Sequence, residues 1–547
     1  MAIKKAIPIL LVCVMLISVF SFSGCVDNGE SSEGTLLRMG FAFPTETDPC
    51  TGTDYSSMVS QLNLYDPLLF PGSDGMEPWI AEDWEISDGG RTWTFHLRDD
   101  VKFHSGRDLQ ADDVLYSMER YVRMASGFGY LFNGSVDMSS SEAVDDHTVQ
   151  FELTSGFGAF EYKLSRFYIF DKEAIQEHSK EDGEFSYPPH GDFARDWLKD
   201  HDAGSGPYEL KEITQDHVIM TRFKDYWGPM HDEAADEVRM LALAEPSTER
   251  TMFASDELEV TSEWIPERVK ELIVDNEGGV LGTYKHSAMP YILMHCRKKP
   301  LDDVHVRKAL AYTLDYETAT DDILPAGTTA TGIISSTLAG AAKLDMPTQD
   351  LDKAEEELKK SEYYPDIVEN PEEYEIEFAW NADVPSTENL GLLLAGDAEE
   401  IGLNVNPVKY TYGALVDMMR KQDTSPDMVP MFNSAQYGDA GSLIEAMYGS
   451  SNAQTTFQNS WLLNDTLDKQ IEKAMNETDE QQRFSMYRDL QEEILQMYPA
   501  IYTCDLPSTH VYQPYVDWPA MESENNIPDV QYYFDCRKIG VTPIGER

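Results

Sequence analysis

Alternating hydrophobic and polar positions predict a β-hairpin early in the chain. Trp84 and Ile86 alternate with polar residues, a Ser-Asp-Gly-Gly turn follows, and Trp93 and Phe95 then alternate again. This pattern is typical of two paired strands that bury one face. The apolar positions of residues 111–120 then recur at helical spacing, so the hairpin is expected to lead into a helix.

The rest of the chain mixes strand and helix patterns. Residues 36–43 are expected to form a first strand. The sequence shows no repeat of 20–50 residues, which disfavours solenoids and propellers. With 547 residues, the chain exceeds a single ordinary core. We therefore expect an α/β protein of at least two lobes.

The charge of the chain is strongly negative. It contains 98 acidic and 42 basic residues, which gives a formal net charge of −56. This excludes nucleic acid as an expected partner, because a phosphate backbone requires a basic face. The acidic residues are spread along the chain, which fits either an ordinary solvated surface or, as we favour, adaptation to a salt-rich environment.

The N-terminus has the pattern of a secretory signal. Lys4 and Lys5 precede an apolar stretch, residues 6–22, which ends at Phe22-Ser23-Gly24-Cys25. These four residues resemble a lipobox, in which the cysteine is lipidated and becomes the mature N-terminus. An uncleaved membrane anchor is the alternative. Both place the protein outside the cytoplasm, on the outer face of the cell membrane.

Four further cysteines would remain in an oxidising compartment, where disulfides persist. They are Cys50, Cys296, Cys504 and Cys536. Three pairings are open, and buried free thiols are an equal alternative.

The hairpin region and its flanks resemble the opening region of family 5 extracellular solute-binding proteins, the peptide/nickel-type substrate-binding lipoproteins of ABC importers. Further similar segments extend the resemblance over nearly all of the mature chain. The segments that carry it are 65–69, 80–85, 88–98, 100–106, 111–117, 204–210, 224–228, 291–301, 302–312, 351–360, 490–494 and 499–502.

The resemblance implies a periplasmic-binding-protein-like α/β fold, with two large lobes, a hinge and a hairpin-bearing subdomain in the first lobe. Capture of the solute would occur by closure of the lobes. The expected organisation is a lipoprotein signal peptide at 1–24, a tether at 25–35, lobe I at 36–290 with an inserted subdomain at about 80–203, lobe II at 291–504, and a C-terminal return to lobe I at 505–547.

A cleft between the lobes is the expected ligand site, since small-molecule sites favour such positions. The candidate lining residues follow or end expected strands, and ordinary core packing is an equal alternative for the aromatic ones. They are Phe43, Thr45, Tyr55, Trp264, His295, Trp380, Asn381, Phe432, Asn433, Gln436, Tyr437 and Asp439.

One segment of the expected cleft departs from the family pattern. Peptide-binding relatives commonly carry WxxDYPDP here, in which the tryptophan stacks on the ligand and the first aspartate holds the ligand's α-ammonium. This chain has Asn433 and Gln436 at those two positions. We therefore expect that it does not hold a free peptide N-terminus in the usual way. Asp439 is either an alternative anchor for the ligand's ammonium group or an ordinary turn residue.

Two roles are open to His295, that of a metal ligand and that of a histidine in the core or the pocket. Met294, Cys296, His286 and Met289 are near it in the sequence. Alternation along a strand places Met294 and Cys296 on the face opposite His295, so the three do not converge. A core or pocket histidine is therefore favoured over a metal ligand, and no cofactor or metal is expected.

An enzyme is disfavoured, because the chain contains no GxSxG, HExxH, Walker A, GxGxxG or CxxC motif. The favoured function is the extracytoplasmic substrate-binding component of an ABC importer for an oligopeptide-like solute. A metal-chelate receptor of the nickel type, an exported hydrolase and an orphan surface receptor remain alternatives. The expected partners are the ligand, the ABC permease and ATPase subunits and, through lipid on Cys25, the membrane; the protein is expected to be a monomer.

Overall fold

The structure is a computed structural model, which describes residues 34–41, 46–72, 75–180, 191–243, 245–382, 384–522, 527–528 and 531–543. Within it, Thr35–Arg547 forms one unit. The expected signal peptide and the lipidation site Cys25 lie outside the described residues. Phe43 and Thr45, two of the candidate ligand-binding residues, lie outside them as well.

The predicted hairpin is confirmed. Strand β4 (Ala81–Ser87) pairs antiparallel with β5 (Thr92–Leu97), whose alternate residues are buried. The turn between them has positive φ at Asp88, Gly89 and Gly90, which explains the two glycines, since they adopt this conformation without steric cost. Strands β7 (Thr148–Glu152) and β6 (Glu142–Asp145) complete a four-stranded sheet in the order β4-β5-β7-β6.

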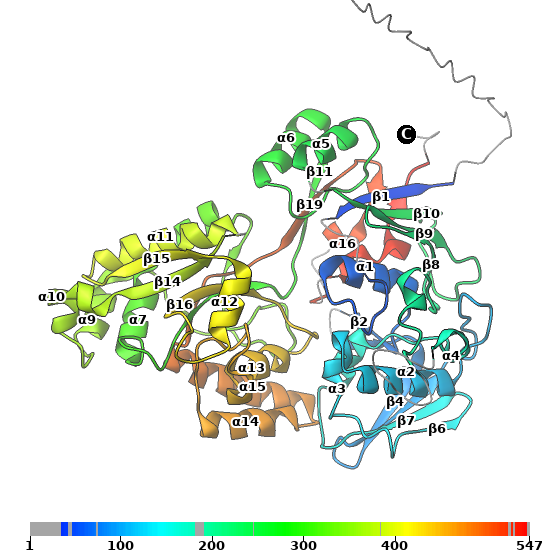
Figure 1. The fold of residues 1–547 in the computed structure, drawn as a ribbon, viewed down its shortest axis with the longest axis horizontal. Coiled ribbons are helices and arrows are strands. Elements are labelled where there is room, and N and C mark those ends of the chain that lie inside the picture. The colour runs from blue at the N-terminus through cyan, green and yellow to red at the C-terminus, as the bar shows by residue number, and fades with distance from the viewer. Residues whose placement is uncertain are drawn as a thin grey trace, which may run out of the picture. The chain divides into compact units, whose positions relative to one another are not determined.

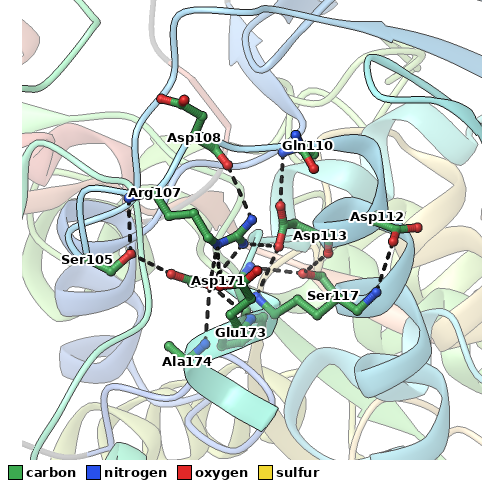
Figure 2. A network of polar contacts seen from close by, with 12 residues as sticks. Ser105, Arg107, Asp108, Gln110, Asp112, Asp113, Ser117, Asp171, Glu173 and Ala174 are labelled. Carbon is green, nitrogen blue, oxygen red and sulfur yellow. Dashed lines mark hydrogen bonds and ion pairs between the residues drawn. The ribbon is translucent and has the colours of Figure 1, made fainter. Parts of the chain in front are cut away.

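A polar network joins two helices beside this sheet, α2 (Ala111–Met124) and α4 (Lys172–His178), as Figure 2 shows. Arg107 donates from Nε to Oδ1 of Asp171 over 3.0 Å and also contacts the Asp113 carboxylate. Asp171 in turn caps the start of α4, and Asp113 lies in the first turn of α2. The Arg107 guanidinium therefore joins the starts of two helices, and both of its carboxylate partners, Asp113 and Asp171, are buried.

A second four-stranded sheet has the order β1-β10-β9-β8. Strand β1 (Leu36–Phe41) pairs in parallel with β10 (Glu237–Ala242), although they are some two hundred positions apart. The strands β9 (His217–Arg222) and β8 (Tyr208–Ile213) follow by antiparallel pairing.

The third sheet has five strands in the order β15-β14-β16-β12-β17. All six residues of β12 are buried: Tyr291 and Leu293 belong to one apolar cluster, and Ile292 and Met294 belong to another. Because successive side chains of a strand point to opposite faces, helices must cover both faces of this sheet. The strands are β12 (Met289–Met294), β14 (Ile376–Asn381), β15 (Val405–Tyr410), β16 (Met428–Asn433) and β17 (Ala500–Tyr502).

Two groups of helices supply that cover (Figure 1). Asp303 caps the first helix of one group by accepting a hydrogen bond from the His305 amide. This group contains α7 (Val304–Thr313), α9 (Leu351–Leu358) and α11 (Pro385–Glu399); the other contains α12 (Tyr412–Met419), α13 (Gly441–Tyr448), α14 (Asp465–Met475) and α15 (Glu480–Met497).

Strand β19 (Ser508–Tyr512) pairs with β11 (Val280–Tyr284), so the C-terminal segment returns to a strand that precedes the five-stranded sheet in the sequence. The remaining helices and strands lie outside the three larger sheets and the two helix groups. They are α1 (Tyr55–Leu64), α3 (Phe160–Lys163), α5 (Pro246–Ala254), α6 (Glu267–Glu277), α8 (Tyr316–Thr318), α10 (Asp366–Glu369), α16 (Pro519–Glu522), β2 (Leu69–Gly72), β3 (Gly75–Pro78), β13 (Thr328–Thr329), β18 (Cys504–Asp505), β20 (Val516–Asp517) and β21 (Gly540–Val541).

Cys50, Cys296, Cys504 and Cys536 are free, and all except Cys296 are buried. Of the two alternatives for these residues, the structure has free thiols. None of the described helices is both long enough and apolar enough to cross a bilayer.

Candidate functional site

Two neighbouring cavities lie between the segment around α3 and the segment that follows β16. One has a volume of about 740 Å³ and the other of about 450 Å³. Tyr130, Gln436 and Phe457 line both of them, so the two cavities meet at these residues. Other lining residues that carry polar groups are Asn133, Ser135, Lys163, Tyr437, Ser442, Glu445, Ser451, Asn452, Thr455 and Thr456 in the first cavity, and Thr53, Arg166 and Ser434 in the second.

Gln436 is held at this meeting point through its backbone. Its carbonyl oxygen accepts a hydrogen bond of 2.9 Å from Nε of Arg166, and its amide donates to Oγ of Ser442 over 3.0 Å. Arg166 is itself only 2% exposed. Because both bonds involve backbone atoms, they fix the position of residue 436 whatever side chain it carries.

The segment that precedes α3 also contacts the helices α14 and α15. Arg483 donates from a terminal guanidinium nitrogen to the Gly158 carbonyl over 2.9 Å, and the Gly158 amide donates to the Met475 carbonyl over 3.0 Å. A Cβ atom at residue 158 would lie 1.7 Å from the carbonyl oxygen of Glu477. Glycine is therefore required for this close approach of two backbones.

Asp439 belongs to this contact and does not line either cavity. Its carboxylate lies 3.5 Å from Nε of Arg483, and both side chains are almost fully buried. It also accepts a hydrogen bond of 2.8 Å from the Gly441 amide, and burial raises the pKa of its carboxyl group. These contacts give Asp439 a structural role and leave it poorly placed to anchor a ligand.

The other candidates after β14 and β16 differ in position. Tyr437 is 2% exposed and lines the larger cavity. Asn433 and Trp380 are buried, and Phe432 packs against the same apolar cluster as Trp380. With Asn381, these three residues are absent from the lining of both cavities.

His295 occupies a core position. It is fully buried, its Nε2 lies 3.1 Å from the Gln422 carbonyl oxygen, and its ring stacks on Trp461. Burial lowers its pKa, which favours the neutral imidazole. Among the described residues, no three His, Cys, Asp or Glu side chains lie close enough together to hold a metal ion.

Tyr55 and Trp264 lie on a different part of the chain. The hydroxyl of Tyr55, at the start of α1, contacts the hydroxyl of Tyr533. Trp264 is 69% exposed in the segment that precedes α6. The backbone amide of Ser262, two residues earlier, donates to Oε2 of the buried Glu249 over 2.7 Å, which positions this segment.

Glu249→Gln is expected to raise the free energy of unfolding by about 1 kcal/mol at pH 8 and to change it little at pH 5. Burial raises the pKa of the Glu249 carboxyl group to about 7. The folded state therefore holds this proton more tightly than the unfolded state, and stability is lost as the pH rises from about 4.5 to about 7. The neutral amide avoids this loss. Urea unfolding at the two pH values measures it, and an equal effect at both would contradict the assignment.

The sequence interpretation missed the two cations at the cavities, Lys163 and Arg166. They lie three positions apart in a segment whose aromatic and apolar neighbours are typical of core packing. The available signal was their charge, because two closely spaced basic residues beside buried aromatics are unusual in so acidic a chain.

Comparisons with known proteins agree on one family. The family model described as "Bacterial extracellular solute-binding proteins, family 5 Middle" matches residues 75–455. The probable D,D-dipeptide-binding periplasmic protein of Escherichia coli is 23% identical over 471 residues, which cover 84% of this chain and 86% of that protein.

Two solved structures are similar in fold. The ABC transporter substrate-binding protein CtaP of Listeria monocytogenes has a TM-score of 0.79 at 21% identity, with 93% of this chain and 99% of that chain covered. NikA of Brucella suis, in complex with Fe(III)-EDTA, has a TM-score of 0.74 at 20% identity, with the same coverage of both chains.

Proposed function

Since the chain belongs to the bacterial extracellular solute-binding proteins of family 5, we propose that it captures an oligopeptide-like solute and delivers it to an ABC permease. The predicted fold class is confirmed by the solved structures that it resembles. The observation that carries the proposal is the pair of connected cavities between α3 and the segment after β16. Their lining is rich in hydroxyl and amide groups, which suits the backbone of a short peptide.

Closure of two lobes around the solute is the proposed mechanism. The proposed boundaries are lobe I at 36–290, with an inserted subdomain at about 80–203, lobe II at 291–504 and a return at 505–547. The pairing of β11 with β19 supports the return. The contacts of Arg166 with Gln436 and of Arg483 with Gly158 would then join the lobes in the closed form. Energy for transport comes from partner ATPase subunits, so no hydrolytic activity is proposed.

Family members act outside the cytoplasm, and we propose that lipid on Cys25 holds this chain, as a monomer, on the outer face of the membrane. The lipobox-like residues 22–25 support this anchor. Mass spectrometry of the protein from a membrane fraction tests it: a diacylglyceryl mass on the peptide that begins at Cys25 is expected.

The binding proposal is tested by calorimetry with a mixture of free di- to pentapeptides. A ligand present at a hundred times its Kd stabilises a protein by about 2.7 kcal/mol, so the melting temperature should rise by several degrees. A nickel–histidine complex serves as the test of the chelate alternative. A melting temperature that neither addition changes would contradict the proposed function.

High salt is expected to stabilise the protein. Between 0.1 M and 2 M KCl, the melting temperature should rise by roughly 5–10 °C, because salt shortens the range over which like charges repel. The formal charge of −56 supplies that repulsion. Thermal unfolding followed by circular dichroism measures the shift, and an equal melting temperature in both buffers would refute the proposed adaptation to salt.

A further inference from the structure

In the part of the chain that the structure describes, Lys163 forms no ion pair with a carboxylate, although the protein is very acidic. It is the last residue of α3, and its Nζ donates to the Leu131 carbonyl over 3.3 Å. The nearest ring, that of Phe157, has its centroid 4.2 Å from Nζ. Burial lowers the pKa of its amino group, as expected for a partly desolvated charge.

Tyr437 places a buried polar group at the same cavity. Its hydroxyl is buried and has no hydrogen-bond partner in the described part of the chain. Burial raises its pKa well above 10, so the group is a neutral hydroxyl that can donate a hydrogen bond. A buried polar group without a partner costs free energy, which a bound ligand would recover.

The two groups are close to one another. Nζ of Lys163 lies 5.8 Å from the centroid of the Tyr437 ring, and both residues line the cavity of about 740 Å³. Because both residues line one cavity, their ammonium group and hydroxyl offer two donors, which is an arrangement that suits a carboxylate. Glu445 is an exposed residue that also lines this cavity. Its negative charge would repel a second negative group on a ligand whose first carboxylate is bound by Lys163.

We propose that Lys163 and Tyr437 form a subsite that binds a carboxylate of the transported solute. This inference rests on the proposed function and narrows its ligand class to solutes with at least one carboxylate. That carboxylate comes either from the C-terminus of a peptide or from the organic carrier of a metal chelate. Lys163 and Tyr437 line the same cavity as Gln436, and they supply a contact to the ligand's carboxylate that does not require a carboxylate at residue 436.

Lys163→Met tests the subsite. Equilibrium dialysis is carried out with di- to pentapeptides as free acids, the same peptides as C-terminal amides, and a nickel–histidine complex, with bound probe measured by mass spectrometry. The wild type is expected to retain the free acids at least about ten-fold better than the amides. Lys163→Met should weaken binding of the free acids about ten- to a hundred-fold, with no effect on the amides.

Two matched controls separate binding from folding. Tyr437→Phe should weaken binding of the free acids by about two- to ten-fold, whereas Tyr291→Phe, which removes another buried hydroxyl without a partner in the described chain, should change nothing. Lys172→Met removes a lysine that pairs with Asp112 over 3.0 Å, outside the cavity linings, and should also leave binding unchanged.

The possible outcomes distinguish failure of the carboxylate subsite from failure of the proposed solute-binding function. Retention of the nickel complex in place of peptides, with the same loss in Lys163→Met, would support the subsite and assign its carboxylate to a chelate. Equal binding of the free acids by wild type and Lys163→Met would overturn the subsite while the proposed function stands. A wild type that retains none of the probes would overturn both.

Discussion

Arg120→Met is expected to lower the free energy of unfolding by about 3–5 kcal/mol, because it leaves a buried carboxylate without its counter-charge. Arg120 is fully buried in α2 and donates two hydrogen bonds to Asp48, of 2.7 and 2.6 Å. It also donates to the carbonyl of Phe193. Three distant segments therefore depend on one guanidinium. Urea unfolding followed by circular dichroism measures the change.

Arg123→Met provides the control for that variant. Arg123 lies in the same helix, is 49% exposed and pairs with Glu119 at the surface, where an ion pair contributes only about 0–1 kcal/mol. The double variant Asp48→Asn with Arg120→Met should recover part of the stability, since it removes the isolated charge. A loss below about 1 kcal/mol in Arg120→Met alone would contradict the role assigned to the pair.

Gln436→Asp is expected to strengthen binding of peptides with a free α-ammonium by about ten- to a hundred-fold. A charge-assisted hydrogen bond contributes roughly 1.5–3 kcal/mol, and glutamine cannot supply it. Gln436 lines both cavities, while its backbone is held by Arg166 and Ser442. The substitution should therefore place a carboxylate in the cleft without moving the chain.

Isothermal titration with a free peptide and with its N-acetylated form measures this gain. The acetylated form, which has no ammonium group, should bind wild type and Gln436→Asp equally well, and Gln436→Asn should behave like the wild type. A variant that binds both forms with unchanged affinity would show that residue 436 does not face the ligand's amine.

Local sequence patterns predicted the hairpin, and short-range chemistry also explains the start of one helix and the composition of one strand. The hairpin at β4 and β5 follows from alternation and from a turn with two glycines. The start of α7 follows from Asp303, whose side chain satisfies a free amide at the helix end. The apolar run of β12 reflects a strand that is buried on both faces.

The candidate site was predicted less completely, because its residues meet only through the fold. Asp439 pairs with Arg483, which lies 44 positions later, and no local pattern marks that pair. Lys163 and Arg166 lie far from Gln436 in the sequence, yet they line the same connected cavities. Conversely, His295 was a candidate for the ligand site, but its ring is packed in the core and contacts the Gln422 carbonyl.

Native mass spectrometry of the protein as purified, with identification of any released ligand, tests the central claim most directly. A peptide-binding protein should release a ladder of masses from short peptides, each with a free C-terminal carboxylate. A single released mass with a metal isotope pattern would contradict the assignment to peptides and would identify a chelate as the solute.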